Sequence, residues 1–116
     1  MTSSISCRLA EKTDLPEILR LYAQPEVDDG RVLPLEKAEN IFERINNYPD
    51  YTLYVADSNG VIVGTFALFI MENLGHLGAP SAIIEDVAVD PKHQGRGVGK
   101  LMMAHALNVA VQKGCY

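Results

Sequence analysis

The stretch Gln94-Gly95-Arg96-Gly97-Val98-Gly99 follows an apolar run that carries two carboxylates, residues 83–89, and precedes a helical pattern. Glycine lets the backbone adopt positive φ angles and lets a ligand approach the main chain without meeting a Cβ atom. The first turn of the following helix carries unpaired N–H groups and the positive end of the helix dipole. This order of strand, glycine loop and helix predicts a site for a phosphate or diphosphate, to which Arg96 and Lys100 add positive charge.

The spacing of the glycines excludes two known kinds of phosphate-binding loop. A Walker loop requires a glycine five residues before its Gly-Lys pair and a hydroxyl residue after that pair, but these positions hold Gln94 and Leu101. A dinucleotide-binding loop has the spacing Gly-x-Gly-x-x-Gly, whereas Gly95, Gly97 and Gly99 alternate. Neither pattern therefore fits this segment.

A third pattern is similar at every fixed position. Gln94, Gly97 and Gly99 resemble the acyl-CoA pyrophosphate loop of the GNAT superfamily of N-acyltransferases, which reads Gln/Arg-x-x-Gly-x-Gly/Ala between the fourth strand and the third helix. Residues 85–91 also resemble the strand and turn that precede this loop in many members. The resemblance implies acetyl-CoA as the co-substrate. The alternative is a glycine-rich turn that binds no ligand.

The resemblance also implies which residues hold the cofactor. In the family, N–H groups of the loop bind the pyrophosphate, and main-chain groups of the fourth strand bind the pantetheine arm in a gap beside that strand. The cofactor-binding residues that follow for this chain are Val87, Ala88, Val89, Gln94, Gly95, Arg96, Gly97, Val98, Gly99 and Lys100.

Two adjacent acids, Glu85 and Asp86, are the candidate catalytic residues. Acetyl transfer to an amine requires a group that accepts the amine's proton, and a carboxylate can do so directly or through water. Strand alternation puts Glu85 on the face of Val87 and Asp86 on the face of Ala88, unless a bulge intervenes. We therefore expect at most one base, with Glu85 favoured and Asp86 in a positioning role. The alternative is that both acids form structural ion pairs.

Composition restricts the function further. A net charge of −5 with dispersed basic residues argues against a nucleic-acid partner. The longest apolar stretch, Val61 to Met71, is too short to span a bilayer, and the first six residues lack a signal-peptide pattern, so we expect no membrane partner and a cytoplasmic protein. Cys7 and Cys115 lack metal-ligand spacing, so no metal is expected.

Hydrophobic periodicity and turn signals predict the order βααβββα. The expected class is α/β (α+β), with a mixed, mostly antiparallel central sheet flanked by helices. Asp14 is the expected N-cap of the first helix. The predicted strands are 5–9, 51–56, 61–70 and 82–89, and the predicted helices are 14–22, 35–47 and 97–113.

This order corresponds to the N-terminal two-thirds of the GNAT fold, which continues through a fifth strand, a fourth helix and a closing hairpin. In the family, a tyrosine of the fourth helix often serves as the general acid. We therefore expect residues 1–116 to form a single domain that ends before strand five. Two explanations stay open: the chain is a truncated or cleaved product, or a second copy in a homodimer, or another chain, supplies the missing strands.

The predicted function is transfer of an acetyl group from acetyl-CoA to a primary amine of a small molecule by direct attack. Glu26, Asp28 and Asp29, between the first two helices, would suit a cationic acceptor such as a polyamine, aminoglycoside or lysine. His76 is a further candidate near the acceptor. One alternative is a protein N-terminal or lysine acetyltransferase, and another is a non-catalytic acyl-CoA-binding or interaction module.

Overall fold

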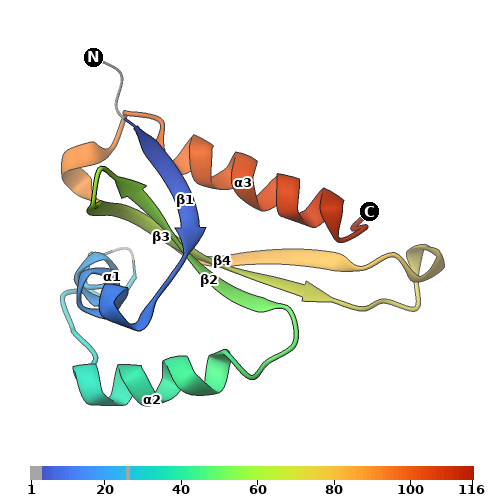
Figure 1. Ribbon diagram of the computed structural model, residues 1–116, viewed down its shortest axis with the longest axis horizontal. Helices are drawn as coiled ribbons and strands as arrows, with labels where there is room; N and C mark the ends of the chain where they lie inside the picture. Colours follow the sequence, from blue (N-terminus) through green and yellow to red (C-terminus); the bar gives the residue numbers. More distant parts are fainter. Residues whose placement is uncertain (1–3, 26) are drawn as a thin grey trace.

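The computed structural model describes residues 4–25 and 27–116, so residues 1–3 and Glu26 lie outside the described residues. The described chain forms a four-stranded antiparallel sheet in the order β1-β2-β3-β4, with three helices (Figure 1). The strands are β1 (Ile5–Leu9), β2 (Tyr51–Ser58), β3 (Val61–Met71) and β4 (Ser81–Val89). The helices are α1 (Leu15–Tyr22), α2 (Leu35–Ile45) and α3 (Val98–Gln112), with 3-10 turns η1 (Lys12–Asp14), η2 (His76–Gly78) and η3 (Pro91–His93). The predicted class and element order are confirmed.

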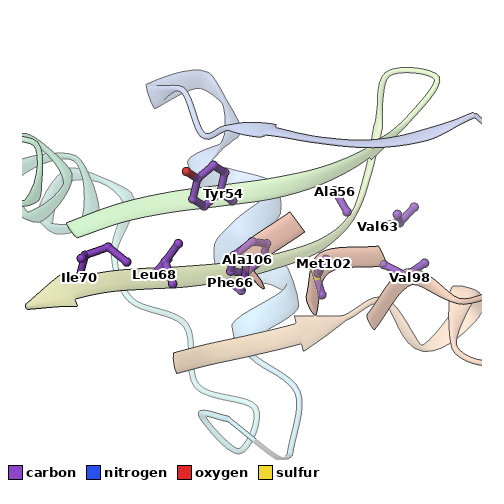
Figure 2. Packing of buried hydrophobic residues seen from close by; sticks show 9 residues of the cluster. All are labelled: Tyr54, Ala56, Val63, Phe66, Leu68, Ile70, Val98, Met102 and Ala106. Carbon is purple, nitrogen blue, oxygen red and sulfur yellow. The ribbon is translucent and has the colours of Figure 1, made fainter. Parts of the chain in front are cut away.

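The sheet separates two layers, because α1 and α2 lie on one face and α3 lies on the other (Figure 1). Apolar residues alternate along β2 and β3, so each face of the sheet has its own core. The core under α1 and α2 consists of Leu15, Ile18, Leu21, Phe42, Val55, Ile62 and Ala88. The core under α3 consists of Tyr54, Ala56, Val63, Phe66, Leu68, Ile70, Val98, Met102 and Ala106 (Figure 2).

Gly64 allows α3 to approach the sheet closely. A Cβ atom added at this glycine would lie 2.9 Å from Met102 Sδ and 3.0 Å from Val98 Cγ1. Side chains in a packed interior cannot yield that space without strain. The absence of a side chain at Gly64 therefore fixes the start of α3 beside β3 and β4.

Asp14 departs in one detail from the predicted N-cap role. It does precede α1, but its side chain makes no capping hydrogen bond to that helix. Its carboxylate instead accepts the N–H of Glu11 at 2.7 Å and two hydrogen bonds from Arg8 at 2.8 and 3.0 Å. The acid therefore anchors the end of β1 to the η1 turn.

β4 is an edge strand, and α3 carries exposed apolar side chains. Leu101, Leu107 and Val111 are 37%, 57% and 72% exposed. In the part of the chain that the structure describes, no helix is long and apolar enough to cross a bilayer.

Candidate active site

A bulge interrupts β4 where the two candidate catalytic acids lie. Between the pairs Thr65–Ala88 and Ala67–Glu85, β3 advances by two residues while β4 advances by three. The extra residue leaves the normal hydrogen-bonding ladder and increases the local twist. Asp86, inside this bulge, has φ 54°, a left-handed conformation that asparagine and aspartate tolerate better than other side chains do.

The bulge puts both acids on the face of the sheet that carries α1 and α2. Glu85 accepts a hydrogen bond of 3.1 Å from the Tyr51 hydroxyl, and Asp86 lines a groove together with Tyr22. Val87 contributes instead to a small void beside Met102 on the α3 side. Simple alternation, which separates Glu85 from Asp86 and pairs Glu85 with Val87, is therefore wrong here, because the bulge shifts the pattern by one residue.

Burial and charge act on the ionisable groups of this region. Burial raises the pKa of Asp86, and the nearby Glu85 and Asp28 carboxylates raise it further. Burial and the hydrogen bond to Glu85 raise the pKa of Tyr51 to about 12, so its hydroxyl stays protonated at neutral pH. Burial followed by the Asp86 charge also raises the pKa of Tyr22.

The glycine loop turns by means of two left-handed glycines, Gly95 and Gly97, both with φ 81°. Gly97 is the N-cap of α3, and its carbonyl accepts the first helical hydrogen bond, from Leu101 N–H at 2.9 Å. The Arg96 N–H donates to the His93 carbonyl at 3.3 Å. Among the described residues, no hydrogen bond uses the N–H groups of Gly95, Gly97, Val98, Gly99 or Lys100.

A cavity of about 420 Å³ lies between the loop, the end of β4 and the segment after α1. Its lining includes every residue that the sequence predicts to bind the cofactor, except Arg96. The predicted residues in its lining are Val87, Ala88, Val89, Gln94, Gly95, Gly97, Val98, Gly99 and Lys100. The cavity thus joins apolar strand residues to unpaired N–H groups, a combination suited to an apolar arm that ends in a diphosphate.

Three further residues line this cavity: Gln24 and Val27, which the sequence did not predict, and His93, whose place beside the glycine loop makes it a candidate for contact with the phosphates. The Gln24 side-chain amide donates a hydrogen bond of 2.9 Å to the Val89 carbonyl. His93 Nδ1 is buried, lacks a hydrogen-bond partner among the described residues, and lies 4.0 Å from Asp90 Oδ2. No local sequence pattern marks Gln24 and Val27 as site residues, because they follow the end of α1 and reach the cavity only through tertiary packing.

The main chain of Val89 faces away from the sheet. The next residue, Asp90, donates its N–H to the Val63 carbonyl at 2.9 Å, so it faces β3. Hydrogen-bonding direction alternates along an antiparallel strand, and the Val89 N–H and carbonyl therefore point to the open edge. The bond from Gln24 to this carbonyl agrees with that direction.

Asp90 fixes the junction between β4 and the loop. Its side chain is buried, accepts the Lys92 N–H at 2.9 Å and contacts Arg20 Nη2 at 3.2 Å. Burial by itself would raise the pKa of Asp90, but the Lys92 N–H and the Arg20 charge outweigh it and lower the pKa. The cavity is therefore built on an ionised carboxylate that ties α1 to the end of β4.

The other sequence candidates lie elsewhere. His76 stacks on Tyr116 with ring centroids 3.6 Å apart and lines neither the cavity nor the groove. Asp28 lines the groove beside Asp86, whereas Asp29 does not. Within residues 4–25 and 27–116, no cluster of three or more His, Cys, Asp or Glu side chains could hold a metal ion.

The fold, and the cavity between the end of β4 and the glycine loop, are consistent with one class of protein. The sequence model of the acetyltransferase (GNAT) family matches residues 15–116, and the chain belongs to that family.

Individual relatives agree with this class. The chain is similar to a glucosamine 6-phosphate N-acetyltransferase of Trypanosoma brucei brucei, with 39% identity over 57 residues, which cover 49% of this chain and 39% of the relative. The match thus spans about two-fifths of that curated relative. A structure from Agrobacterium tumefaciens, named as a candidate acetyltransferase, has a TM-score of 0.87 and 34% identity over 96% of this chain and 76% of its own. Glucosamine-6-phosphate N-acetyltransferase from Arabidopsis thaliana has a TM-score of 0.86 and 25% identity, covering 97% of this chain and 78% of its own.

Proposed function

We propose that this protein transfers an acetyl group from acetyl-CoA to a primary amine of a small molecule. The observation that carries the proposal is the cavity in which the outward main chain of β4 meets the unpaired N–H groups of the glycine loop. Its position at the start of α3 favours an anionic ligand, because the helix dipole adds to the free N–H groups. The family of the chain supports the choice of an acyl-CoA.

We assign the two ends of the donor to the two ends of this cavity. The N–H groups of Gly95, Gly97, Val98, Gly99 and Lys100 would hold the diphosphate, with Arg96 contributing charge from outside the cavity lining. The outward main chain of Val89 would bind an amide of the pantetheine arm after the Gln24 side chain moves away from the Val89 carbonyl. The acyl end would then lie toward Val87 and the bulge.

The carboxylates at the bulge supply the acid–base chemistry in this proposal. When bound, acetyl-CoA supplies a thioester carbonyl that a neutral amine can attack. The amine's proton then passes to Glu85 or Asp86, which lie on one face of the sheet. Tyr51 orients Glu85, and burial with the neighbouring carboxylates raises the pKa of Asp86, which makes Asp86 a better proton acceptor than an exposed aspartate. The new carbon–nitrogen bond replaces the carbon–sulfur bond of the thioester, and CoA would leave as the thiolate.

The pH dependence of two variants separates these candidates. If Glu85 is the base, Glu85→Gln should abolish the acidic limb of the kcat/KM profile, while Asp86→Asn should preserve it. The opposite pattern would assign the base to Asp86. Wild-type turnover and an unchanged profile in both variants would exclude a carboxylate base at this bulge.

Donor binding is tested first, without an acceptor. Acetyl-CoA should raise the melting temperature of the full chain, and ATP and NAD should not at the same concentration. Release of CoA thiol should then be measured with a panel of small amines, a lysine peptide and a free peptide N-terminus. No thermal shift with acetyl-CoA would contradict the donor assignment, and thiol release only with the peptides would favour a protein acetyltransferase. A thermal shift without thiol release for any acceptor would favour an acyl-CoA-binding module.

A further inference from the structure

A second hollow, which we name the α1–α2 groove, lies beside Asp86 of the β4 bulge. The cavity beside the glycine loop, proposed above to hold acetyl-CoA, is named the donor cavity. The groove has a volume of about 180 Å³. Its polar lining consists of Tyr22, Asp28, Tyr51 and Asp86. Its apolar lining consists of Leu15, Ile18, Leu19, Leu33, Ala38, Ile41, Phe42, Ile45 and Leu53.

At two points along the chain, one residue lines the donor cavity and the adjacent residue lines the groove. Val87 lines the cavity, and the preceding Asp86 lines the groove. Val27 lines the cavity, and the following Asp28 lines the groove. Two independent segments therefore form a common boundary, and a ligand in the groove would lie next to the acyl end of the donor.

The size and lining of the groove suit a compact apolar group. Ile41, Ile45, Leu33 and Leu53 are only partly buried, so an apolar ligand would remove exposed hydrocarbon from water. An apolar cavity of about 150 Å³ accepts one benzene ring. The groove therefore has room for a phenyl ring or a short branched aliphatic group.

The charges at its mouth suit a cation. Asp28 and Asp86 form no ion pair with any other described residue. A bound ammonium group would provide the missing counter-charge at the boundary with the donor cavity.

We propose that the α1–α2 groove binds the apolar body of the acceptor, a primary amine carried on a phenyl-sized or short branched aliphatic group, with the amino group between Asp28 and Asp86. This inference rests on the proposed acetyl transfer for the identity of the reaction. It names an acceptor class that differs from the phosphorylated amino sugar after which two relatives are named. The unpaired carboxylates argue against the acyl chain of a longer acyl-CoA as the occupant, because such a chain carries no cation.

Binding is measured directly by calorimetry on the full chain, without and with saturating acetyl-CoA. The probes are 2-phenylethylamine, its neutral counterpart 2-phenylethanol, glucosamine 6-phosphate, and hexanoyl-CoA beside acetyl-CoA. We expect 2-phenylethylamine to bind at least tenfold more tightly than either the alcohol or the amino sugar phosphate.

Two variants and one matched control locate that binding. Ile41→Trp fills the groove and should weaken 2-phenylethylamine at least tenfold while leaving acetyl-CoA binding unchanged. Leu35→Trp changes an exposed aliphatic residue of α2 that does not line the groove, and should have no effect. Asp28→Asn should weaken the amine several-fold without affecting the alcohol. Circular dichroism and melting temperature verify that each variant is folded.

Three results would overturn the proposal. The first is tighter binding of glucosamine 6-phosphate than of 2-phenylethylamine. The second is equal binding of 2-phenylethylamine to the Ile41→Trp and Leu35→Trp variants. The third is that Ile41→Trp weakens the binding of hexanoyl-CoA but not the binding of acetyl-CoA or 2-phenylethylamine. That result would mean that the groove holds the acyl chain of a longer acyl-CoA. Since one of the two amine titrations is done without acetyl-CoA, a failure of acetyl-CoA to bind would contradict the proposed function separately.

Discussion

The hydroxyl oxygen of Tyr51 lies 3.1 Å from Oε1 of Glu85, so a residue of β2 holds a carboxylate of β4 across the intervening strand β3. Burial and this hydrogen bond raise the pKa of Tyr51 to about 12. The hydroxyl therefore remains a donor throughout the neutral pH range and fixes the orientation of the carboxylate beside the bulge.

Loss of this donor should slow the proposed reaction. Hydrogen bonds to charged groups contribute about 1.5–3 kcal/mol, and we expect Tyr51→Phe to lower kcat about tenfold with an unchanged KM for acetyl-CoA. Steady-state thiol-release kinetics measure both constants. Tyr48→Phe is the control, because the exposed Tyr48 ring packs edge-on against Tyr51 at 6.0 Å and makes no hydrogen bond to Glu85. An unaltered kcat in Tyr51→Phe would show that the hydrogen bond has no catalytic role.

The same tyrosine should make stability fall at high pH. The pKa of a tyrosine in the unfolded chain is about 10, whereas the pKa of Tyr51 in the folded protein is about 12. Between these values the folded state binds more protons than the unfolded state, so the free energy of unfolding decreases as the pH rises. Urea unfolding across this range should show a shallower decrease in Tyr51→Phe than in the wild type. A steeper decrease would contradict the assignment.

Asp86 provides a test of the bulge itself. Left-handed backbone disfavours β-branched side chains, so Asp86→Val should lower the free energy of unfolding by about 1–2 kcal/mol. Asp86→Asn should stay close to the wild type, because asparagine tolerates this conformation. Urea denaturation compares the two variants. Equal stability of both would mean that the residue is not held at positive φ in solution.

The loop glycines should separate stability from donor binding. Gly99 has ordinary helical φ and open space around its Cα, so Gly99→Ala should stabilise α3 by about 0.5–1 kcal/mol. It should nevertheless weaken acetyl-CoA, because the added methyl group stands in the cavity lining. Gly97→Ala should lose both stability and affinity, because Gly97 has φ 81°. Calorimetry with acetyl-CoA and urea unfolding give the two readouts, and tighter acetyl-CoA binding by Gly99→Ala would contradict the proposed site.

Local sequence patterns predicted most of the fold. The helices α1 and α2 each have one periodic apolar stripe, whereas α3 also carries exposed apolar residues such as Leu107 and Val111. Each strand lies between clear turn residues, so the predicted boundaries differ from the observed ones by only a few residues. The second helix, for example, ends at Ile45 rather than Asn47. The exception is the β4 bulge, which depends on how this strand pairs with β3 and leaves no local pattern in residues 85–88.

The sequence pointed to most residues of the donor cavity because they are nearly contiguous, from Val87 to Lys100, while their binding of a donor stays a prediction. Gln24 and Val27 could not be predicted, because only tertiary packing brings the end of α1 against Val89. The α1–α2 groove has the same origin. Residues such as Ile41 and Phe42 resemble ordinary core positions in the sequence, and only the packing of α2 leaves a hollow beside Asp86.

The two hollows share only the chain junctions at Val27–Asp28 and Asp86–Val87. In the proposed assignment, the donor is recognised by one short segment, whereas most of the groove belongs to the two N-terminal helices. With this division, replacing residues 33–45 would change the proposed acceptor site without altering any residue that lines the donor cavity.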